Sequence, residues 1–552
     1  MRAVLLFIAL PCFAGELSPE AQIALTSLRE GERARVEAAL GDATQLPLYR
    51  GDFTVDPAAR TASGKVALTL SKVPARRELL LRVTPNAAHK GAITLRDAKL
   101  NGANVPVEAR DATLFRVALP ADATAPLTLE LSVNAKVPAL PNQAPGLEDT
   151  RGDYGAFSAA DDTVSLVGLM PMLVPEVAGH RFDAPAGLGD LGSFAPSNFL
   201  LSVTAPTPWR VVANGQAVGE VPTGKGATRF AYAVGAARDV PVLLVKQPQV
   251  VTKKSGDVEL EAVLLTTDKA QATRVLKQTA ELLTMLEKHL GPYPYKTLRV
   301  VEQRLSSGAG GMEFPGLVTV SALLLSGESD PLAQLGLGGQ QNQVLTAALA
   351  PMLSQLLAQT LEFALAHELA HQYSAMLVGN DPVGEPAADE PLTQHLALLA
   401  MEWNGSGSAN AMREGQLKMS YQLHRALGGA DGRVDRPTSA FTSNREYAAL
   451  IYGKAPLVFD ALRKQLGADA WDQVLKHYVE QNRYRWVNAR TLFELAAAES
   501  GQRKQVEALR KHWWEELHGD EDLTGQFQSA GQVDAATLKQ LDQLMKALSG
   551  QE

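Results

Sequence analysis

The residues best suited to chemistry are two histidines with a glutamate between them, in the run His367-Glu368-Leu369-Ala370-His371. The flanks are rich in Ala and Leu and free of Gly and Pro, which predicts a helix. Four helical residues turn through about 400°, so His367 and His371 project from one face. Two imidazoles at this spacing can bind one divalent ion, and Glu368 can reach a water on that ion without ligating it. Zinc suits these donors and lowers the pKa of bound water to about 7. The alternative is two surface histidines on an Ala-rich helix, because so short a pattern recurs by chance.

A third ligand is available in Glu390, which follows His371 after eighteen intervening residues. A carboxylate on a following helix would complete two nitrogens and one oxygen and leave one position open, as in a catalytic zinc site. Glu385 and Asp389 are alternatives for the same role.

The pattern His-Glu-x-x-His, eighteen residues, then Glu resembles the M1 family of zinc aminopeptidases. The resemblance implies one zinc ion on His367, His371 and Glu390, with Glu368 as the base. It also implies peptide substrates with a free N-terminus. For the fold it implies an N-terminal saddle of strands followed by a thermolysin-like, mainly helical zinc-peptidase domain.

A glycine-rich segment, residues 308–316, contains one acidic residue, Glu313. Such a strand edge could pair with an extended peptide while Glu313 holds a cation at its end. From the residues alone, a glycine turn with an exposed Glu is favoured. The M1 motif Gly-x-Met-Glu-Asn is matched by Gly310, Gly311, Met312 and Glu313, with Phe314 in place of Asn. This resemblance implies that Glu313 binds the substrate's α-amino group, within a substrate site formed by the matched residues.

Two tyrosines can stabilise the negative oxygen that develops during peptide hydrolysis, because a phenol can donate a hydrogen bond to it. These are Tyr447 and Tyr452, and packing in the core is the simpler role for either. The family's Tyr-x-Lys-Gly pattern is matched by Tyr452-Gly453-Lys454-Ala455, so the resemblance implies Tyr452. His395 is expected to be a satisfied core residue rather than a partner of the metal site.

The 552 residues are too many for one core and predict an α+β multidomain chain. Short alternating runs with turn residues between them predict an antiparallel β sandwich or saddle. Mostly helical patterns follow it, and a single helix is predicted over Leu17–Ala39. The expected division is a signal peptide at 1–14, a helical segment at 15–45, an all-β domain at 46–250, a catalytic domain at 251–480 and closing C-terminal helices at 481–552. A glycine-containing spacer around Gly336–Gly339, with a mobile flap near the site as the alternative, and a terminal helix over Ala535–Leu548 are also expected.

The beginning of the chain suggests export. Arg2, the apolar run Ala3–Ala9 and a small residue at Ala14 are typical of a signal peptide, and the run is too short to span a membrane. We expect a periplasmic or secreted protein, with a buried N-terminal strand as the alternative. Cys12 is a candidate lipid anchor, although Pro11 is unfavourable directly before such a site. Because Cys12 is the only cysteine, no disulfide is expected. The net charge of −8 gives no reason to expect nucleic acid as a partner.

The function expected from these observations is that of a zinc aminopeptidase that cleaves by metal-activated water attack. A zinc endopeptidase or epoxide hydrolase on the same scaffold is one alternative. Another is an inactive peptide-binding relative, since Phe314, Pro391 and Ala455 depart from the family pattern.

Overall fold

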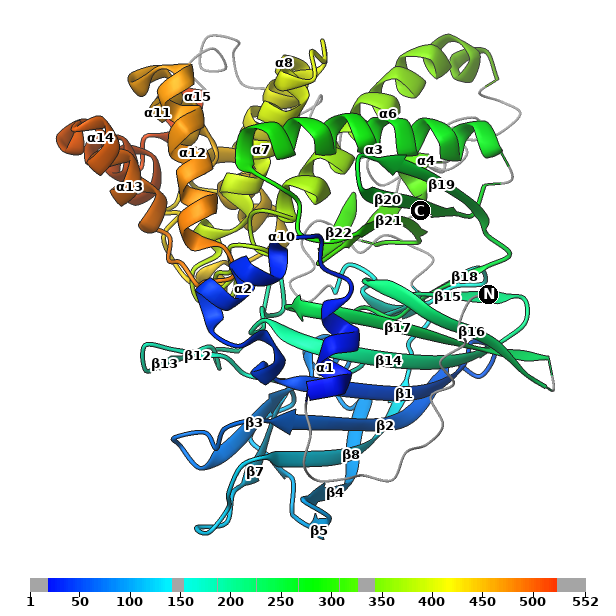
Figure 1. Cartoon of the computed structure of the whole chain (residues 1–552). Coiled ribbons are helices and arrows are strands. Elements are labelled where there is room, and N and C mark those ends of the chain that lie inside the picture. The colour runs from blue at the N-terminus through cyan, green and yellow to red at the C-terminus, as the bar shows by residue number, and fades with distance from the viewer. Residues whose placement is uncertain are drawn as a thin grey trace.

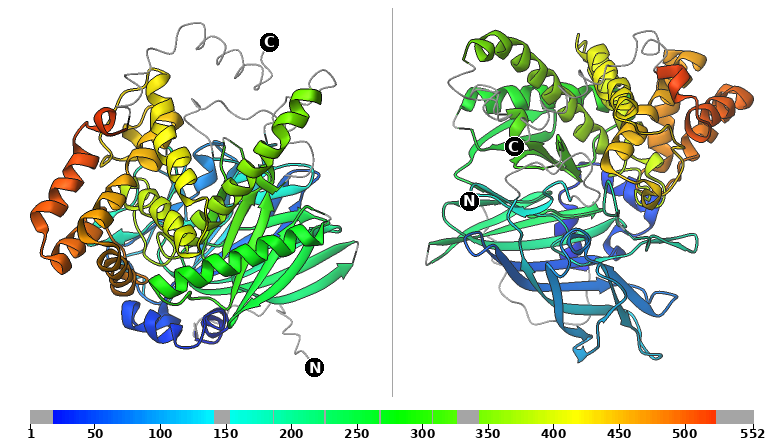
Figure 2. Two further views of the ribbon diagram at one scale, coloured as in Figure 1. Left: turned by 90° about the horizontal axis from the view of Figure 1, so that it is seen from above. Right: turned by 180° about the vertical axis from the view of Figure 1, so that it is seen from behind.

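The computed structural model describes residues 18–140, 153–185, 187–224, 226–266, 268–306, 308–325 and 343–523, with only the backbone for 343–353. The predicted signal peptide with Cys12, the Gly336–Gly339 spacer and the Ala535–Leu548 helix lie outside these residues. In Figure 1 the β part occupies the lower half, with a smaller sheet and most of the helices above it, and the view from behind in Figure 2 agrees. The proposed domain boundaries stay a prediction; those at 250 and 480 fall inside a strand and a helix.

An eight-stranded sheet forms the centre of the β part, in the order β16-β17-β14-β1-β2-β8-β4-β5. Its strands are β1 Leu48–Asp56, β2 Thr61–Leu70, β4 Ile93–Leu100, β5 Ala103–Asn104, β8 Leu127–Lys136, β14 Ser197–Pro206, β16 Gln216–Gly224 and β17 Ala227–Ala237. These strands follow from the alternation of apolar and polar residues in the sequence. In β8, the buried Leu127, Leu129 and Leu131 face the core, and the residues between them are more exposed. One pair departs from the expected antiparallel arrangement, because β1 and β14 pair in parallel, with Leu48 opposite Asn198. Turn residues in the sequence mark hairpins between consecutive strands. Strands β1 and β14 are far apart in sequence and are not joined by a hairpin, so turn residues could not indicate that they pair.

Smaller sheets complete the β part, in the orders β15-β18-β10-β9 and β11-β3-β7-β6, together with the ribbon β12-β13. Their strands are β3 Glu78–Arg82, β6 Glu108–Ala109, β7 Leu114–Ala118, β9 Phe157–Ala159, β10 Thr163–Leu166, β11 Met172–Leu173, β12 Glu176–Val177, β13 His180–Arg181, β15 Trp209–Val212 and β18 Leu243–Lys246. Two short 3-10 helices, η1 Ala43–Gln45 and η2 Thr84–Asn86, also belong to this part.

The predicted N-terminal helix is two helices, α1 Ser18–Leu25 and α2 Glu32–Leu40. Gly31 separates them with a left-handed φ of 77°, which only glycine adopts without strain. The break lets the buried Glu32 carboxylate accept a hydrogen bond from the Tyr484 hydroxyl at 2.7 Å and pair with Arg483. A long-range bond of this kind leaves no trace in the local helical pattern.

A five-stranded sheet carries the glycine-rich segment at its edge, in the order β19-β20-β21-β23-β22. Its strands are β19 Gln249–Ser255, β20 Val258–Leu264, β21 Thr297–Gln303, β22 Gly311–Phe314 and β23 Leu317–Ser321. Between β20 and β21 runs α3 Lys269–Leu290, capped by the Asp268 side chain and buried along one face. The long helix α6, Gln343–His371, contacts this sheet at β22 and β23. Strand β22 therefore lies directly beside the helix that carries both histidines.

From α6 to Leu523 the described chain is mostly helical. The elements are α4 Ala322–Leu325 before it, then η4 Pro386–Ala388, α7 Glu390–Trp403, α8 Ala409–Met412, η5 Arg413–Lys418, α9 Met419–Ala426, η6 Thr438–Ala440, α10 Asn444–Tyr447, η7 Ala448–Lys454, α11 Leu457–Leu466, α12 Ala468–Asn482, α13 Thr491–Ser500, α14 Arg503–Arg510, η8 Lys511–Glu515 and α15 Gly519–Leu523. Of these, η5, η7 and η8 are π-helical. Helix α7 packs against α6 and begins with Glu390.

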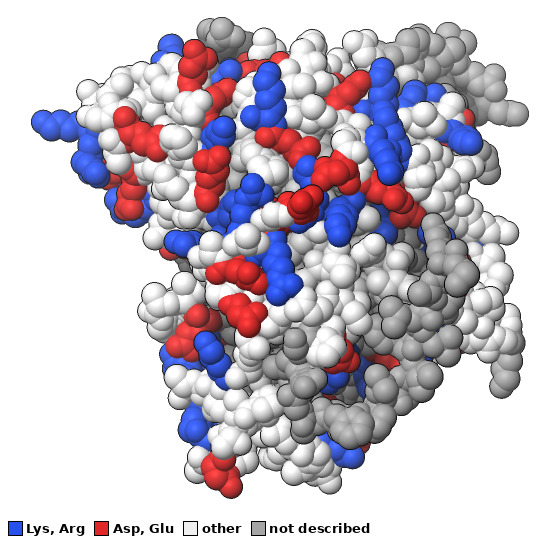
Figure 3. Space-filling model, viewed as in Figure 1, with Lys and Arg blue, Asp and Glu red and all other residues white. Residues whose placement is uncertain are grey.

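The outer surface carries both signs of charge, and Figure 3 shows acidic and basic side chains intermixed on the face viewed. Within the described residues, no helix has the length and apolar character needed to cross a bilayer.

Candidate active site

The two histidines and Glu390 meet at the junction of α6 and α7. The Nε2 atoms of His367 and His371 are 3.1 Å apart. Glu390 Oε2 lies 3.3 Å from Nε2 of His367 and 3.5 Å from Nε2 of His371. The geometry thus brings together the three residues that the sequence nominates as ligands, all with little solvent exposure.

This triangle has the size that a small tetrahedral ion requires. Ligand atoms about 2.0–2.1 Å from a tetrahedral zinc lie about 3.3–3.4 Å from one another. The three observed separations bracket that value. Oε2 of Glu390 is buried and has no hydrogen-bond partner among the described groups, as expected of an atom whose partner is an ion. The donor set therefore fits zinc.

The alternative carboxylates are not part of this triangle. Asp389 Oδ1 lies 3.6 Å from Nδ1 of His371, on the side of the ring away from the triangle, where the Thr393 hydroxyl is also 3.2 Å away. Such groups orient a ligating imidazole. Glu385 accepts a hydrogen bond from the Ala489 amide instead.

Glu368 points into the same cavity from α6 and is 4% exposed. Burial raises the pKa of its carboxyl to about 8, and the positive charge of His371 opposes this shift. Gly311 of β22 packs against it so closely that a Cβ there would be 2.6 Å from Cγ of Glu368. The glycine is therefore required for the strand to approach the proposed base.

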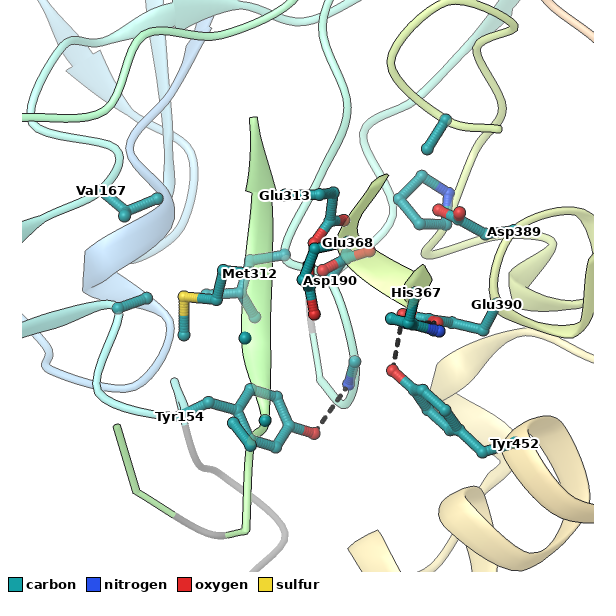
Figure 4. A pocket seen from close by; sticks show the side chains of 18 of the residues that line it. Tyr154, Val167, Asp190, Met312, Glu313, His367, Glu368, Asp389, Glu390 and Tyr452 are labelled. Atoms are coloured by element: carbon teal, nitrogen blue, oxygen red, sulfur yellow. Dashed lines mark hydrogen bonds and ion pairs between the residues drawn. The ribbon is translucent and has the colours of Figure 1, made fainter. Parts of the chain in front are cut away.

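Glu313 extends from edge strand β22 towards the histidines, with Oε1 4.0 Å from Nδ1 of His371. In Figure 4, Glu313, Glu368 and Asp190 converge on the same space as His367 and Glu390. Burial raises the pKa of Glu313 to about 8, and the neighbouring carboxylates Glu368 and Glu390 add to the rise. Glu313 is thus a partly shielded member of the cavity wall rather than an exposed turn residue.

The three departures from the family pattern do not interrupt the cavity. Successive strand residues point to opposite faces, so Phe314 points away from Glu313 into an apolar cluster with residues such as Val245 and Val301. Pro391 occupies the first turn of α7, where a missing N–H is tolerated. Ala455 is buried directly after η7.

Asp190 is a site residue that the sequence reasoning missed. It lies in the loop before β14, within the β part, and lines the cavity. Burial raises its pKa well above the ordinary value, reinforced by the charges of Glu313 and Glu390 and by a hydrogen bond with Glu313. Its only sequence signal is Gly189-Asp190-Leu191-Gly192, a common turn composition with no fixed spacing from the histidines.

The cavity carries a marked excess of negative charge. Seven carboxyl groups and one guanidinium, that of Arg238, line it. Five of the carboxyls interact with the histidines or with one another, and within the described residues none of the five forms an ion pair with Lys or Arg: Asp190, Glu313, Glu368, Asp389 and Glu390. Burial opposes ionisation of Glu390, but the charge of His371 and the close approach of both imidazoles outweigh it and keep the pKa of Glu390 low. A divalent cation and a substrate ammonium are the charges that would neutralise this site.

Of the two candidate tyrosines, Tyr452 faces the triangle. Its hydroxyl donates a 2.6 Å hydrogen bond to Oε1 of Glu390 (Figure 4). Tyr447 packs edge-on against Tyr452, and its hydroxyl lies against Gly189 of the β part. Tyr452 sits on the π-helical η7, a distortion that often occurs at functional sites. His395, by contrast, accepts a hydrogen bond from Trp471 at 2.9 Å within the core, as expected.

The cavity has a volume of about 460 Å³ and is lined from both halves of the protein. The β part contributes residues such as Tyr154, Val167 and Asp190, and the five-stranded sheet and the helices contribute others, including Glu313 and Glu368. Met312 and Val167 form an apolar end of the cavity in Figure 4. The size suits part of a peptide rather than a folded protein surface.

Comparison with solved structures identifies the fold. The chain matches an M1 zinc metallopeptidase mutant from Deinococcus radiodurans bound to a Tyr-Ser-Ala substrate, with 18% identity, 85% of this chain and 94% of that chain covered, and a TM-score of 0.56. Two mutants of a two-domain M1 zinc metallopeptidase, bound to L-arginine and to L-tryptophan, are each 17% identical. They cover 84% of this chain and 93% and 94% of their own, with TM-scores of 0.55.

The chain therefore has the fold of the M1 zinc metallopeptidases, and the expected α+β multidomain architecture is confirmed. No protein-family model matches the chain, and no curated protein sequence matches it. The likeness is thus one of structure.

Proposed function

We propose that this protein is a zinc aminopeptidase, which removes N-terminal residues from peptides. The observation that carries the proposal is one cavity that holds both the His367–His371–Glu390 triangle and the carboxylates of Glu313 and Asp190. The first site suits a metal that activates water, and the second suits an ammonium group. Both sites open into the same cavity, as an enzyme that cleaves next to a free amino end requires.

One zinc ion bound by the triangle would lower the pKa of a coordinated water to about 7 and polarise the scissile carbonyl. Glu368 takes the proton of the attacking water, since burial gives its carboxylate a raised affinity for protons. The same carboxyl then passes the proton to the leaving amine. Tyr452 donates its hydroxyl proton in a hydrogen bond to the oxyanion that forms from the carbonyl.

Glu313 and Asp190 fix the other end of the reacting residue. Burial and neighbouring negative charge raise the pKa of both carboxyls. An incoming α-ammonium group provides the positive charge that stabilises their ionised forms. Binding at this position ends the peptide there and gives exopeptidase selectivity.

The decisive experiment compares a peptide or aminoacyl reporter carrying a free amino end with its N-acetylated form. The zinc-loaded protein should cleave the free form and reject the acetylated one, and chelation should abolish cleavage. Glu368→Gln should keep its zinc by elemental analysis and lose turnover. Equal cleavage of both reporters would indicate an endopeptidase instead, and no cleavage by a zinc-loaded protein would indicate a binding relative.

We also propose that the protein is exported to the periplasm or secreted. Only the character of the first fourteen residues supports this, and N-terminal sequencing of the mature protein would test it. A mature N-terminus at residue 15 would indicate cleavage without lipid attachment at Cys12.

A further inference from the structure

Gln372, the residue directly after His371, joins the metal-binding helix to the strand that carries Glu313. Its side chain is 2% exposed and makes two hydrogen bonds to the backbone. Nε2 donates to the Phe314 carbonyl at 3.0 Å, and Oε1 accepts from the Gly316 amide at 2.9 Å. Both partners belong to the turn between β22 and β23.

That turn sets where β22 ends. Phe314 pairs with Leu317, so Pro315 and Gly316 are the two turn residues, and Gly316 has a φ of 81°. A proline followed by a left-handed glycine is characteristic of a type II turn. Asn214 of the β part donates to the Pro315 carbonyl at 2.9 Å. Gln372 holds the same turn from the side of α6.

The other end of β22 contacts α6 as well. Gly311 lies against Glu368, four residues before Gln372 and therefore about one helical turn away. Between these two contacts lies Glu313, opposite His371. The strand is thus held against the helix at both ends, with the amine-binding carboxylate in the middle.

We propose that Gln372 is a positioning residue that fixes the separation between Glu313 and the metal ligands, and so sets the selectivity for a free amino end. This inference rests on the proposed aminopeptidase function. Gln372 touches neither metal nor substrate, and it acts through the turn at Phe314 and Gly316. Loss of its two bonds lets β22 move relative to α6 while the triangle, built on α6 and α7, stays in place.

The test is Gln372→Met, which keeps the length of the side chain and removes both hydrogen bonds. Its matched control is Asn198→Leu in the β part. Asn198 is buried and bridges two backbone segments, donating to the Ala43 carbonyl at 2.9 Å and accepting from the Ala236 amide at 3.2 Å. It lies outside the cavity lining, so it reports the effect of losing a buried bidentate amide alone.

We expect Gln372→Met to retain its zinc, raise KM for free-amino substrates at least tenfold and reduce the preference for free over acetylated reporter by a similar factor. Gln372→Glu, which keeps the acceptor for the Gly316 amide, should have a KM and a preference between those of the wild type and of Gln372→Met. Asn198→Leu should lower thermal stability comparably and leave KM and preference unchanged.

Unchanged KM and preference in Gln372→Met would overturn the proposal. So would loss of zinc in proportion to activity, or an equal change in Asn198→Leu, because either shows a purely structural role. The wild-type preference is measured first: if the wild type itself does not distinguish the reporters, the proposed function fails before the role of Gln372 is in question.

Discussion

Replacing Gly311 with alanine should damage catalysis far more than the same change at Gly310. A Cβ at residue 311 would lie 2.6 Å from Cγ and Oε1 of Glu368 and 2.5 Å from the Thr319 carbonyl oxygen. At Gly310 the nearest atom would be Cβ of Ala364 at 3.4 Å, an ordinary contact. Neither glycine has a left-handed φ, so the comparison isolates steric overlap from backbone strain.

The size of the effect follows from these distances. Carbon atoms at optimal contact are about 3.5–4.0 Å apart, so the new methyl group overlaps its neighbours by about 1 Å. Overpacking of this kind costs about 1–3 kcal/mol of stability. If Glu368 is displaced by about 1 Å instead, the rate falls about 100-fold.

The assay is kcat on a free aminoacyl reporter, with zinc content and thermal midpoint measured on the same samples. Gly311→Ala should retain zinc and lose about two orders of magnitude in kcat, while Gly310→Ala stays within a fewfold of wild type. Equal activity of the two variants, whether high or low, would refute the argument that Glu368 needs the space above Gly311.

Three further outcomes are expected. Tyr452→Phe removes the hydroxyl that contacts Glu390 but leaves all three ligand atoms, so zinc content should persist while kcat falls about 10²–10³-fold; a near-normal kcat would exclude Tyr452 as oxyanion donor. Chelation should lower the thermal midpoint, because an ion bound only by the folded state stabilises it, and zinc should restore the midpoint and activity together; recovery of only one would separate the metal's two roles. Glu302 is 6% exposed, and burial raises its pKa to about 7, so the folded state binds this proton more tightly than the unfolded state. The stability that this proton provides is complete below about pH 4.5 and is lost as pH rises to about 7, by about 3 kcal/mol in total. The free energy of unfolding from urea titrations should therefore decline less across that range for Glu302→Gln than for the wild type. Identical slopes of unfolding free energy against pH would contradict this.

The metal ligands could be nominated from sequence because their geometry is local. His367 and His371 share one helix, so their spacing alone places both rings on one face. Glu390 begins the next long helix, within a short stretch of chain that offers few other acids. The family motifs then indicated Glu313 and Tyr452. From residue chemistry alone, Glu313 could equally be an exposed turn residue and Tyr452 a tyrosine packed in the core.

Asp190 shows the limit of that reasoning. It comes from the β part and reaches the cavity only because the two halves of the protein pack together. No periodicity or spacing relates it to the histidines. The roles of Gly311 and Gln372 escaped for the same reason, since each depends on how closely β22 approaches α6.

In the fold, too, the elements fixed by local residues could be predicted and those fixed by distant contacts could not. Alternating strands such as β8 and the amphipathic α3 were evident from their residues. The division of the N-terminal segment at Gly31 and the parallel pairing of β1 with β14 were not, because both are decided by contacts with distant parts of the chain.

The most direct measurement of the central claim is anomalous diffraction at the zinc absorption edge from crystals of the zinc-loaded protein. One strong peak is expected in the cavity, within bonding distance of Nε2 of His367, Nε2 of His371 and Oε2 of Glu390. A cavity without a peak, or a peak bound by other residues, would contradict it.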